Sequence, residues 1–117
     1  MPEGDSYSIA RKIAAYSLSK KAQDVSLLDL RPLNSVCDFF IICHGESDAQ
    51  VKAIADAVVE GMEEEGVRVW HTEGYEYLNW VLLDYVDVVV HIFRKETRQF
   101  YGLERLWGDA EMESISE

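Results

Sequence analysis

Carboxylates around one turn are the residues of this chain best suited to metal-assisted chemistry. Asp84 and Asp87 flank that turn, and Asp38 precedes an apolar run elsewhere. Nucleotide-transfer sites bind magnesium between closely paired carboxylates, such as Asp-x-Asp on one strand. The chain has Asp84-x-x-Asp87 instead, with no second pair at strand spacing. A metal-dependent, nucleotidyltransferase-like enzyme using these aspartates is therefore retained as the alternative to a non-enzymatic protein.

The other reactive side chains form weaker patterns. Cys43 and His44 could form a thiol–imidazole pair or a metal site with His71 or His91, but their spacing matches no recognised ligand set. The segment at residues 44–47 precedes a helix and could present backbone amides to an anion. The chain lacks GxGxxG, P-loop and GxSxG motifs. We predict no catalytic residue, no metal ligand and no cofactor.

A hairpin around the two aspartates carries the sharpest inference. If Tyr85-Val86 is the turn, Asp84 pairs with Asp87, and counting back along both strands pairs Trp80 with His91. Side chains alternate between the two faces of each strand. One face is then wholly apolar and suits a core; it comprises Val81, Leu83, Val88, Val90 and Ile92. The other face carries Trp80, Leu82, Val89 and His91, with the aspartates at one end. A tryptophan anchor beside acidic groups is typical of a protein-binding hot spot. Pattern alone leaves open that a helix of the same chain covers this face.

Net charge narrows the class of partner. Lysine and arginine number 11 and aspartate and glutamate 22, so the formal net charge is −11. A surface that reads phosphates needs a basic patch, so we expect no direct sequence-specific nucleic-acid binding. An acidic surface attracts a basic protein partner. Charge that only keeps the domain soluble is the other interpretation.

The lengths of the apolar runs and the number of cysteines indicate the cellular compartment. The longest apolar runs, at residues 39–43 and 80–83, are far shorter than the about 20 residues that span a bilayer. Residues 1–12 lack the apolar core of a signal peptide. We expect a cytoplasmic protein without membrane contact. Cys37 and Cys43 are too few for a disulfide scaffold and are predicted to be buried thiols.

The elements that position these residues follow from apolar spacing. Helices are predicted at residues 6–22, 47–65 and 96–107, and strands at 25–30, 37–43 and 67–71, with two more between 77 and 93. Ser47 and Gln50 form a capping box at the start of the second helix, and Gly66 is placed to end it. The order predicts an α/β fold: a single domain with a mixed sheet of about five strands flanked by helices. The domain covers residues 1–110, and the acidic segment 111–117 is expected to be a disordered tail.

Many short motifs, in order and at consistent spacing, resemble the bacterial ribosomal silencing factor (Iojap) family. In the first half they are Lys20-Lys21-Ala22-Gln23-Asp24-Val25, Asp38-x-Phe40-Ile41-Ile42-Cys43, Gly45-x-Ser47, Ala53-Ile54-Ala55-Asp56 and Glu73-Gly74. In the second half they are Trp80-x-Leu82-x-Asp84, Asp87-Val88-Val89-Val90-His91-Ile92-Phe93 and Arg98-x-Phe100-Tyr101-x-Leu103-Glu104-x-Leu106-Trp107. The resemblance covers roughly residues 6–110.

The resemblance implies a nucleotidyltransferase-like sheet without the catalytic equipment. It also implies binding to large-subunit ribosomal protein fourteen on the large ribosomal subunit. That contact would sterically block joining of the small subunit and repress translation under nutrient limitation. The family also tends to form homodimers.

The contact strand of the family maps onto Trp80, Leu82 and Asp84, with Tyr85 next to them and His91 as a further neighbour. Here Trp80 would be the anchor, Leu82 its packing and Asp84 a partner for a basic residue. Phe100, Tyr101 and Trp107 are expected to hold the last helix on the sheet.

The chain departs from the family at two positions. Val86 stands where the family usually has glycine, which places the predicted turn type in question. His44 stands where the family usually has threonine, and this change leaves the Ser47 cap intact.

Overall fold

A six-stranded sheet runs through the computed structural model, which describes residues 5–116. The strands are β1 (Gln23–Asp29), β2 (Phe39–Gly45), β3 (His71–Glu73), β4 (Trp80–Asp84), β5 (Val88–Arg94) and β6 (Glu111–Ile115). Their spatial order is β3-β4-β5-β2-β1-β6. Only β2 and β5 pair in parallel among the described strands, and the other neighbours are antiparallel. The predicted α/β fold with a mixed sheet is confirmed, with six strands instead of five.

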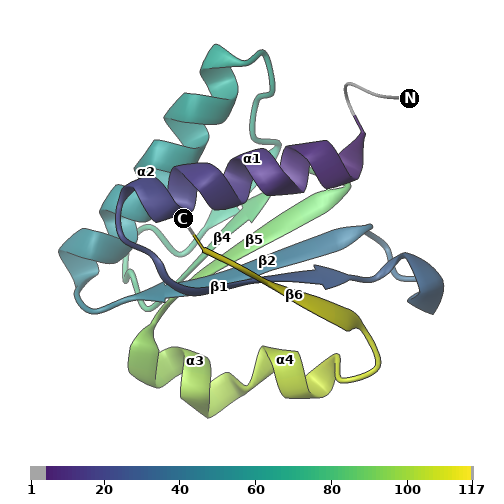
Figure 1. Ribbon diagram of the computed structural model, residues 1–117. Helices are drawn as coiled ribbons and strands as arrows, with labels where there is room; N and C mark the ends of the chain where they lie inside the picture. Colours follow the sequence, from purple (N-terminus) through teal and green to yellow (C-terminus); the bar gives the residue numbers. More distant parts are fainter. Residues whose placement is uncertain (1–4, 117) are drawn as a thin grey trace.

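Two helices cover one face of this sheet (Figure 1). They are α1 (Ser6–Ser19) and α2 (Asp48–Glu64), and their apolar sides pack on the buried face of the central strands. The predicted cap at Ser47 is present, since its hydroxyl accepts a hydrogen bond from the Gln50 amide at 3.1 Å, but the Gln50 side chain accepts from the Glu46 amide instead of the Ser47 amide. Gly66 follows the helix with a positive φ of 86°. The chain leaves β2, crosses one face of the sheet in α2 and returns through β3 and β4 before it enters β5. This long crossover connection allows β2 and β5 to run parallel.

The opposite face is covered by two short helices, α3 (Lys95–Tyr101) and α4 (Leu103–Leu106) (Figure 1). One continuous helix was expected here, but Gly102 adopts a φ of 56° and ends α3. A left-handed residue cannot continue a right-handed helix, and glycine reaches that conformation at little cost. The break turns α4 so that Leu103 and the following Trp107 pack beneath the sheet. Among the described residues no helix is both long and apolar enough to cross a membrane.

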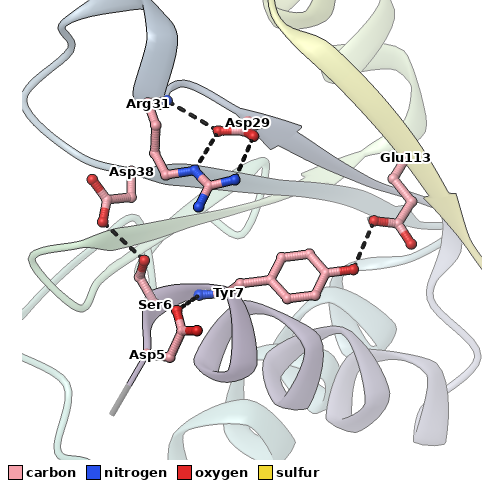
Figure 2. A network of polar contacts seen from close by, with 7 residues as sticks. All are labelled: Asp5, Ser6, Tyr7, Asp29, Arg31, Asp38 and Glu113. Carbon is pink, nitrogen blue, oxygen red and sulfur yellow. Dashed lines mark hydrogen bonds and ion pairs between the residues drawn. The ribbon is translucent and has the colours of Figure 1, made fainter. Parts of the chain in front are cut away.

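The acidic C-terminal segment forms a strand, which corrects the expectation of a disordered tail. Residues 111–115 make β6 and pair with β1 in antiparallel register. Figure 2 shows Tyr7 of α1 reaching Glu113 of β6, with a hydrogen bond of 3.1 Å. Arg11 adds an ion pair with Glu113 at 2.6 Å. The free backbone edge of β1 explains the strand, because a ladder partner satisfies its amide and carbonyl groups.

The hairpin of β4 and β5 is confirmed with a register two residues away from the expected one. Trp80 pairs with Phe93, and Asp84 with Val89. The turn residues are therefore Val86 and Asp87, with Tyr85 and Val88 closing it through a 2.8 Å hydrogen bond. A shift of two preserves the alternation of faces. The five residues predicted to form the apolar face are all fully buried: Val81, Leu83, Val88, Val90 and Ile92.

Val86 sits in this turn with a φ of 76°, although it is β-branched. Such a conformation costs of order 1–3 kcal/mol for a side chain of this kind. Val86→Gly is therefore expected to raise the free energy of unfolding by about 1 kcal/mol, measured by urea denaturation. Asn34→Gly is the matched control, because Asn34 also has a positive φ but asparagine tolerates it. If Val86→Gly raises the free energy of unfolding no more than Asn34→Gly does, the backbone at Val86 is not strained.

Candidate protein-binding surface

Four predicted site residues lie together on the face of the sheet that α3 and α4 cover only in part. Trp80, Leu82 and Asp84 project from alternate positions of β4, and His91 is the pairing partner of Leu82 on β5. Trp80, Leu82 and Asp84 are partly buried, and His91 is 4% exposed. We call these four residues the Trp80 surface. The face predicted from the alternation of side chains is thus formed. The sequence pattern also allowed a helix of the same chain to cover this face, and the helices α3 and α4 cover only one side of it.

A hydrogen bond fixes the anchor of the Trp80 surface. The indole Nε1 of Trp80 donates to Nδ1 of His91 at 3.1 Å. Indole is a donor only, so Nδ1 must accept and the imidazole proton resides on Nε2. The Trp80 ring also packs on Phe93, with ring centroids 4.8 Å apart, and on Tyr101 at 4.9 Å. The tryptophan is therefore held in one orientation, which lowers the entropy it would lose on binding.

His91 is kept neutral by its surroundings. Burial lowers the pKa of His91 to about 4. The Phe40 ring packs edge-on against the imidazole, with centroids 4.5 Å apart. Nε2 is buried without a hydrogen-bond partner among the described residues. His91 thus acts as an acceptor that positions Trp80, and not as a cation.

Asp84 combines a structural bond with partial exposure. Its Oδ1 accepts a hydrogen bond from the Val86 amide at 2.7 Å, which stabilises the turn. Asp87 is exposed in the turn, so two negative charges lie at this end of the hairpin. The direct pairing of the two aspartates expected from the sequence does not occur, because Asp84 pairs with Val89. The charges meet solvent instead of each other.

Tyr85 corrects the predicted site. It follows Asp84 and therefore projects to the opposite face, where it is 9% exposed in the core beneath α2. Burial raises the pKa of Tyr85 to about 12. Adjacent strand residues cannot share one face. Tyr85 is not part of the Trp80 surface.

The last helices supply one aromatic neighbour that sequence reasoning assigned to packing alone. Tyr101 packs on Trp80 yet remains 48% exposed, so it extends the Trp80 surface. Trp107 holds α4 on the sheet as predicted, with its ring 5.5 Å from that of Phe40. Phe100 does not, because it is 79% exposed. The sequence signals this exposure only through helix geometry: adjacent residues project about 100° apart, so Phe100 and Tyr101 cannot both face the sheet.

The cysteine and histidine residues suggested for catalysis are dispersed, whereas Asp38 lies beside Asp87, whose carbonyl accepts a hydrogen bond from the Asp38 amide at 2.8 Å. Cys43 and His44 project to opposite faces of β2, and His71 lies exposed on the edge strand. Asp38 accepts a hydrogen bond from the Ser6 hydroxyl at 2.8 Å (Figure 2). Within residues 5–116 no group of three histidine, cysteine or carboxylate side chains is arranged to hold a metal ion.

The loop expected to present amides to an anion is occupied by the chain itself. The Gln50 side chain accepts from the Glu46 amide at 2.7 Å, and the Ser47 hydroxyl caps the Gln50 amide. Both thiols are buried as predicted. Burial raises the pKa of Cys37 to about 11 and that of Cys43 to about 12, so neither is a thiolate near neutral pH.

Comparison with known proteins gives one consistent result. The family model described as "Ribosomal silencing factor during starvation" matches residues 3–117. A ribosomal silencing factor from Bacillus subtilis is 44% identical over 108 residues, which is 92% of each chain. One from Halalkalibacterium halodurans is 48% identical over 91 residues, or 78% of each chain.

Solved structures agree with the sequence matches. A crystal structure from Chromobacterium violaceum superposes with a TM-score of 0.85 at 33% identity, covering 95% of this chain and 92% of that one. A second, from Bacillus halodurans, has a TM-score of 0.75 at 37% identity, covering 98% and 100%. The names of the curated relatives denote a regulatory protein and not an enzyme. The chain belongs to the ribosomal silencing factor (Iojap) family, as its ordered motifs and its fold both indicate.

Proposed function

We propose that this protein represses translation by binding large-subunit ribosomal protein fourteen on the large ribosomal subunit through the Trp80 surface. The bound domain would occupy the face that the small subunit must reach, so joining is blocked by steric exclusion. No catalysis is needed for this role. The protein would act in the cytoplasm, where free subunits are found.

The geometry of Trp80 is the observation that carries the proposal. A large aromatic ring, partly exposed and held by His91, Phe93 and Tyr101, is the kind of rigid anchor that dominates binding energy in interfaces. Leu82 beside it supplies apolar contact area, and Asp84 a carboxylate at the margin. This is the arrangement of an apolar centre with a polar rim.

Charge supports a basic partner. The chain carries a net charge of −11, and Asp84 and Asp87 lie at one end of the Trp80 surface. Ribosomal proteins are basic as a class, so long-range attraction would raise the rate of encounter. Family membership supports association with the ribosome in general terms.

A subunit-joining assay tests the proposal directly. Purified large subunits are incubated with the protein, small subunits are added, and the mixture is resolved on a sucrose gradient. We expect the protein to travel with large subunits and the yield of joined ribosomes to fall as its concentration rises. If the protein sediments with neither subunit, the ribosomal role is wrong for this chain. If it binds but joining is unchanged, steric exclusion is wrong.

Asp84→Lys is expected to slow association with large subunits by roughly tenfold at low salt. It should also flatten the dependence of the association rate on salt, because attraction to a cationic patch is lost. Both are measured by surface plasmon resonance over a range of salt concentrations. Glu60→Lys, which makes the same charge change on the exposed side of α2, is the matched control. Equal salt slopes for the two variants would remove Asp84 from the interface.

The free protein is expected to form a homodimer, as the family resemblance implies. Sedimentation velocity on the isolated protein measures its mass in solution. If the protein is a monomer at all concentrations, this expectation is wrong, and the proposed binding to the ribosome is not affected.

A further inference from the structure

A cavity of about 860 Å³, which shares no lining residue with the Trp80 surface, is formed by the end of α1, the start of β1, the ends of β2 and β6, and residues of α3 and α4. The end of α1, the end of β6 and the start of α3 lie on the left of Figure 1, with α1 above the sheet and α3 below it. Its walls are partly apolar, through Leu18, Val25 and Ile115, and partly charged. The charged lining side chains are Asp24, Lys95, Arg98, Glu104 and Arg105.

Two cations without an acidic partner among the described residues line this cavity. Of the 11 lysines and arginines, seven form ion pairs with carboxylates of the described residues. The four that form none within residues 5–116 are Lys20, Lys21, Lys95 and Arg105. Lys95 and Arg105 line the cavity, and the other two lie between its lining residues Leu18 and Ala22. In a chain with twice as many acidic as basic residues, a cavity lined by three cations and two carboxylates is locally basic.

A buried histidine in the lining, His44, adds a hydrogen-bond donor to the cavity. Arg98, 8% exposed, is paired with Glu104 and donates to Nδ1 of His44 at 2.9 Å. Arginine only donates, so Nδ1 accepts and Nε2 of His44 carries the proton. His44 is 4% exposed and lines the cavity, and its Nε2–H has no acceptor among the described residues. Burial, with the charge of Arg98, lowers the pKa of His44, so this neutral tautomer prevails at neutral pH.

We infer that this cavity binds an organic phosphate of about nucleotide size. Its phosphate would lie between Lys95, Arg105 and the Nε2–H of His44, since charge-assisted hydrogen bonds are the strong ones. Its uncharged body would pack on the apolar wall. The volume is within the range of small-molecule sites, about 300–1,000 Å³. Asp24 is the remaining unpaired carboxylate of the lining, and Glu104 is already neutralised by Arg98.

The inference goes beyond the ribosomal role and does not depend on it. Isothermal titration of the full chain with adenosine monophosphate, guanosine monophosphate, inorganic phosphate and adenosine tests it. We expect at least one nucleotide to bind more tightly than phosphate or nucleoside alone, because both parts of the cavity are then filled. Lys95→Gln with Arg105→Gln should weaken that binding by roughly tenfold or more. His44→Thr, the usual family residue, should weaken it without unfolding the domain.

The control variant carries Lys52→Gln with Arg68→Gln, an equal change of charge at exposed positions outside the cavity. Nitrogen NMR of the His44 ring should show Nε2 shifting on titration. No binding at millimolar nucleotide, or equal weakening in the control, overturns the inference. A short RNA that binds more tightly than any mononucleotide, and loses binding in the cavity variant, also overturns it in favour of a nucleic-acid contact.

Discussion

Trp80→Ala is expected to weaken binding to large ribosomal subunits by at least about 2 kcal/mol, roughly a thirtyfold rise in the dissociation constant. The ring is the largest apolar group of the Trp80 surface, and its orientation is set by His91 and Tyr101. Truncation removes both the contact area and the exclusion of water around Asp84. Co-sedimentation with isolated subunits at several protein concentrations measures the change.

A matched variant guards this experiment. Trp70→Ala removes another tryptophan, 70% exposed, which precedes β3 and whose amide donates to the Asp84 carbonyl. Trp70 lies just before the first β3–β4 pair, His71 with Asp84, and its ring lies 5.9 Å from that of His71, with no ring contact to Trp80. We expect Trp70→Ala to bind normally. Circular dichroism must show Trp80→Ala folded, since Trp80 also packs on Phe93. A folded variant that binds like the wild type would show that Trp80 is not the anchor.

Acidification is expected to destabilise the domain through His91. Burial lowers the pKa of His91 to about 4, whereas an imidazole in the unfolded chain titrates near about 6.5. Above the unfolded value the ring is neutral in both states and its contribution to stability is complete. As the pH falls toward 4, only the unfolded chain takes up the proton. The free energy of unfolding should therefore fall by about 3 kcal/mol across this window.

Urea denaturation at intervals from pH 7.5 to 4.5 measures that slope. His91→Gln should be less stable at neutral pH, because Trp80 loses its acceptor, and its stability should vary less with pH. Some slope should remain, since the pKa of His44 is also lowered by burial. His71→Gln is the control, because His71 is exposed on the edge strand. A slope for His91→Gln as steep as that of the wild type would exclude His91 as the titrating group.

Local chemistry made much of the fold predictable. The α2 cap at Ser47 and the glycine at position 66 both depend on neighbouring residues only, and both are present. The faces of the hairpin were predicted correctly although the register was wrong, because a shift of two residues keeps alternation intact. The strand expected at 67–71 occurs later, at His71–Glu73. Val67 and Val69 pack against the core without joining a ladder, so their apolar pattern does not mark a strand.

What the sequence could not reveal depends on distant contacts. Nothing near Glu113 indicates a strand; its pairing with β1 and its bond to Tyr7 join residues at opposite ends of the chain. At the site, alternation alone could place Trp80, Leu82 and Asp84 together. It should also have excluded Tyr85, whose inclusion came from the family resemblance instead. The exposure of Tyr101 beside Trp80 required knowing that Gly102 breaks the helix.

The position of β6 has a consequence for the synthesis of this protein. During translation β1 emerges early and pairs with β2, but its other edge stays open until β6 has left the exit tunnel. An open edge can recruit strands of neighbouring nascent chains. The ion pair between Arg11 of α1 and Glu113 of β6 then forms late and helps to hold β6 on that edge. Co-translational folding of this domain is therefore completed only when its final strand is released.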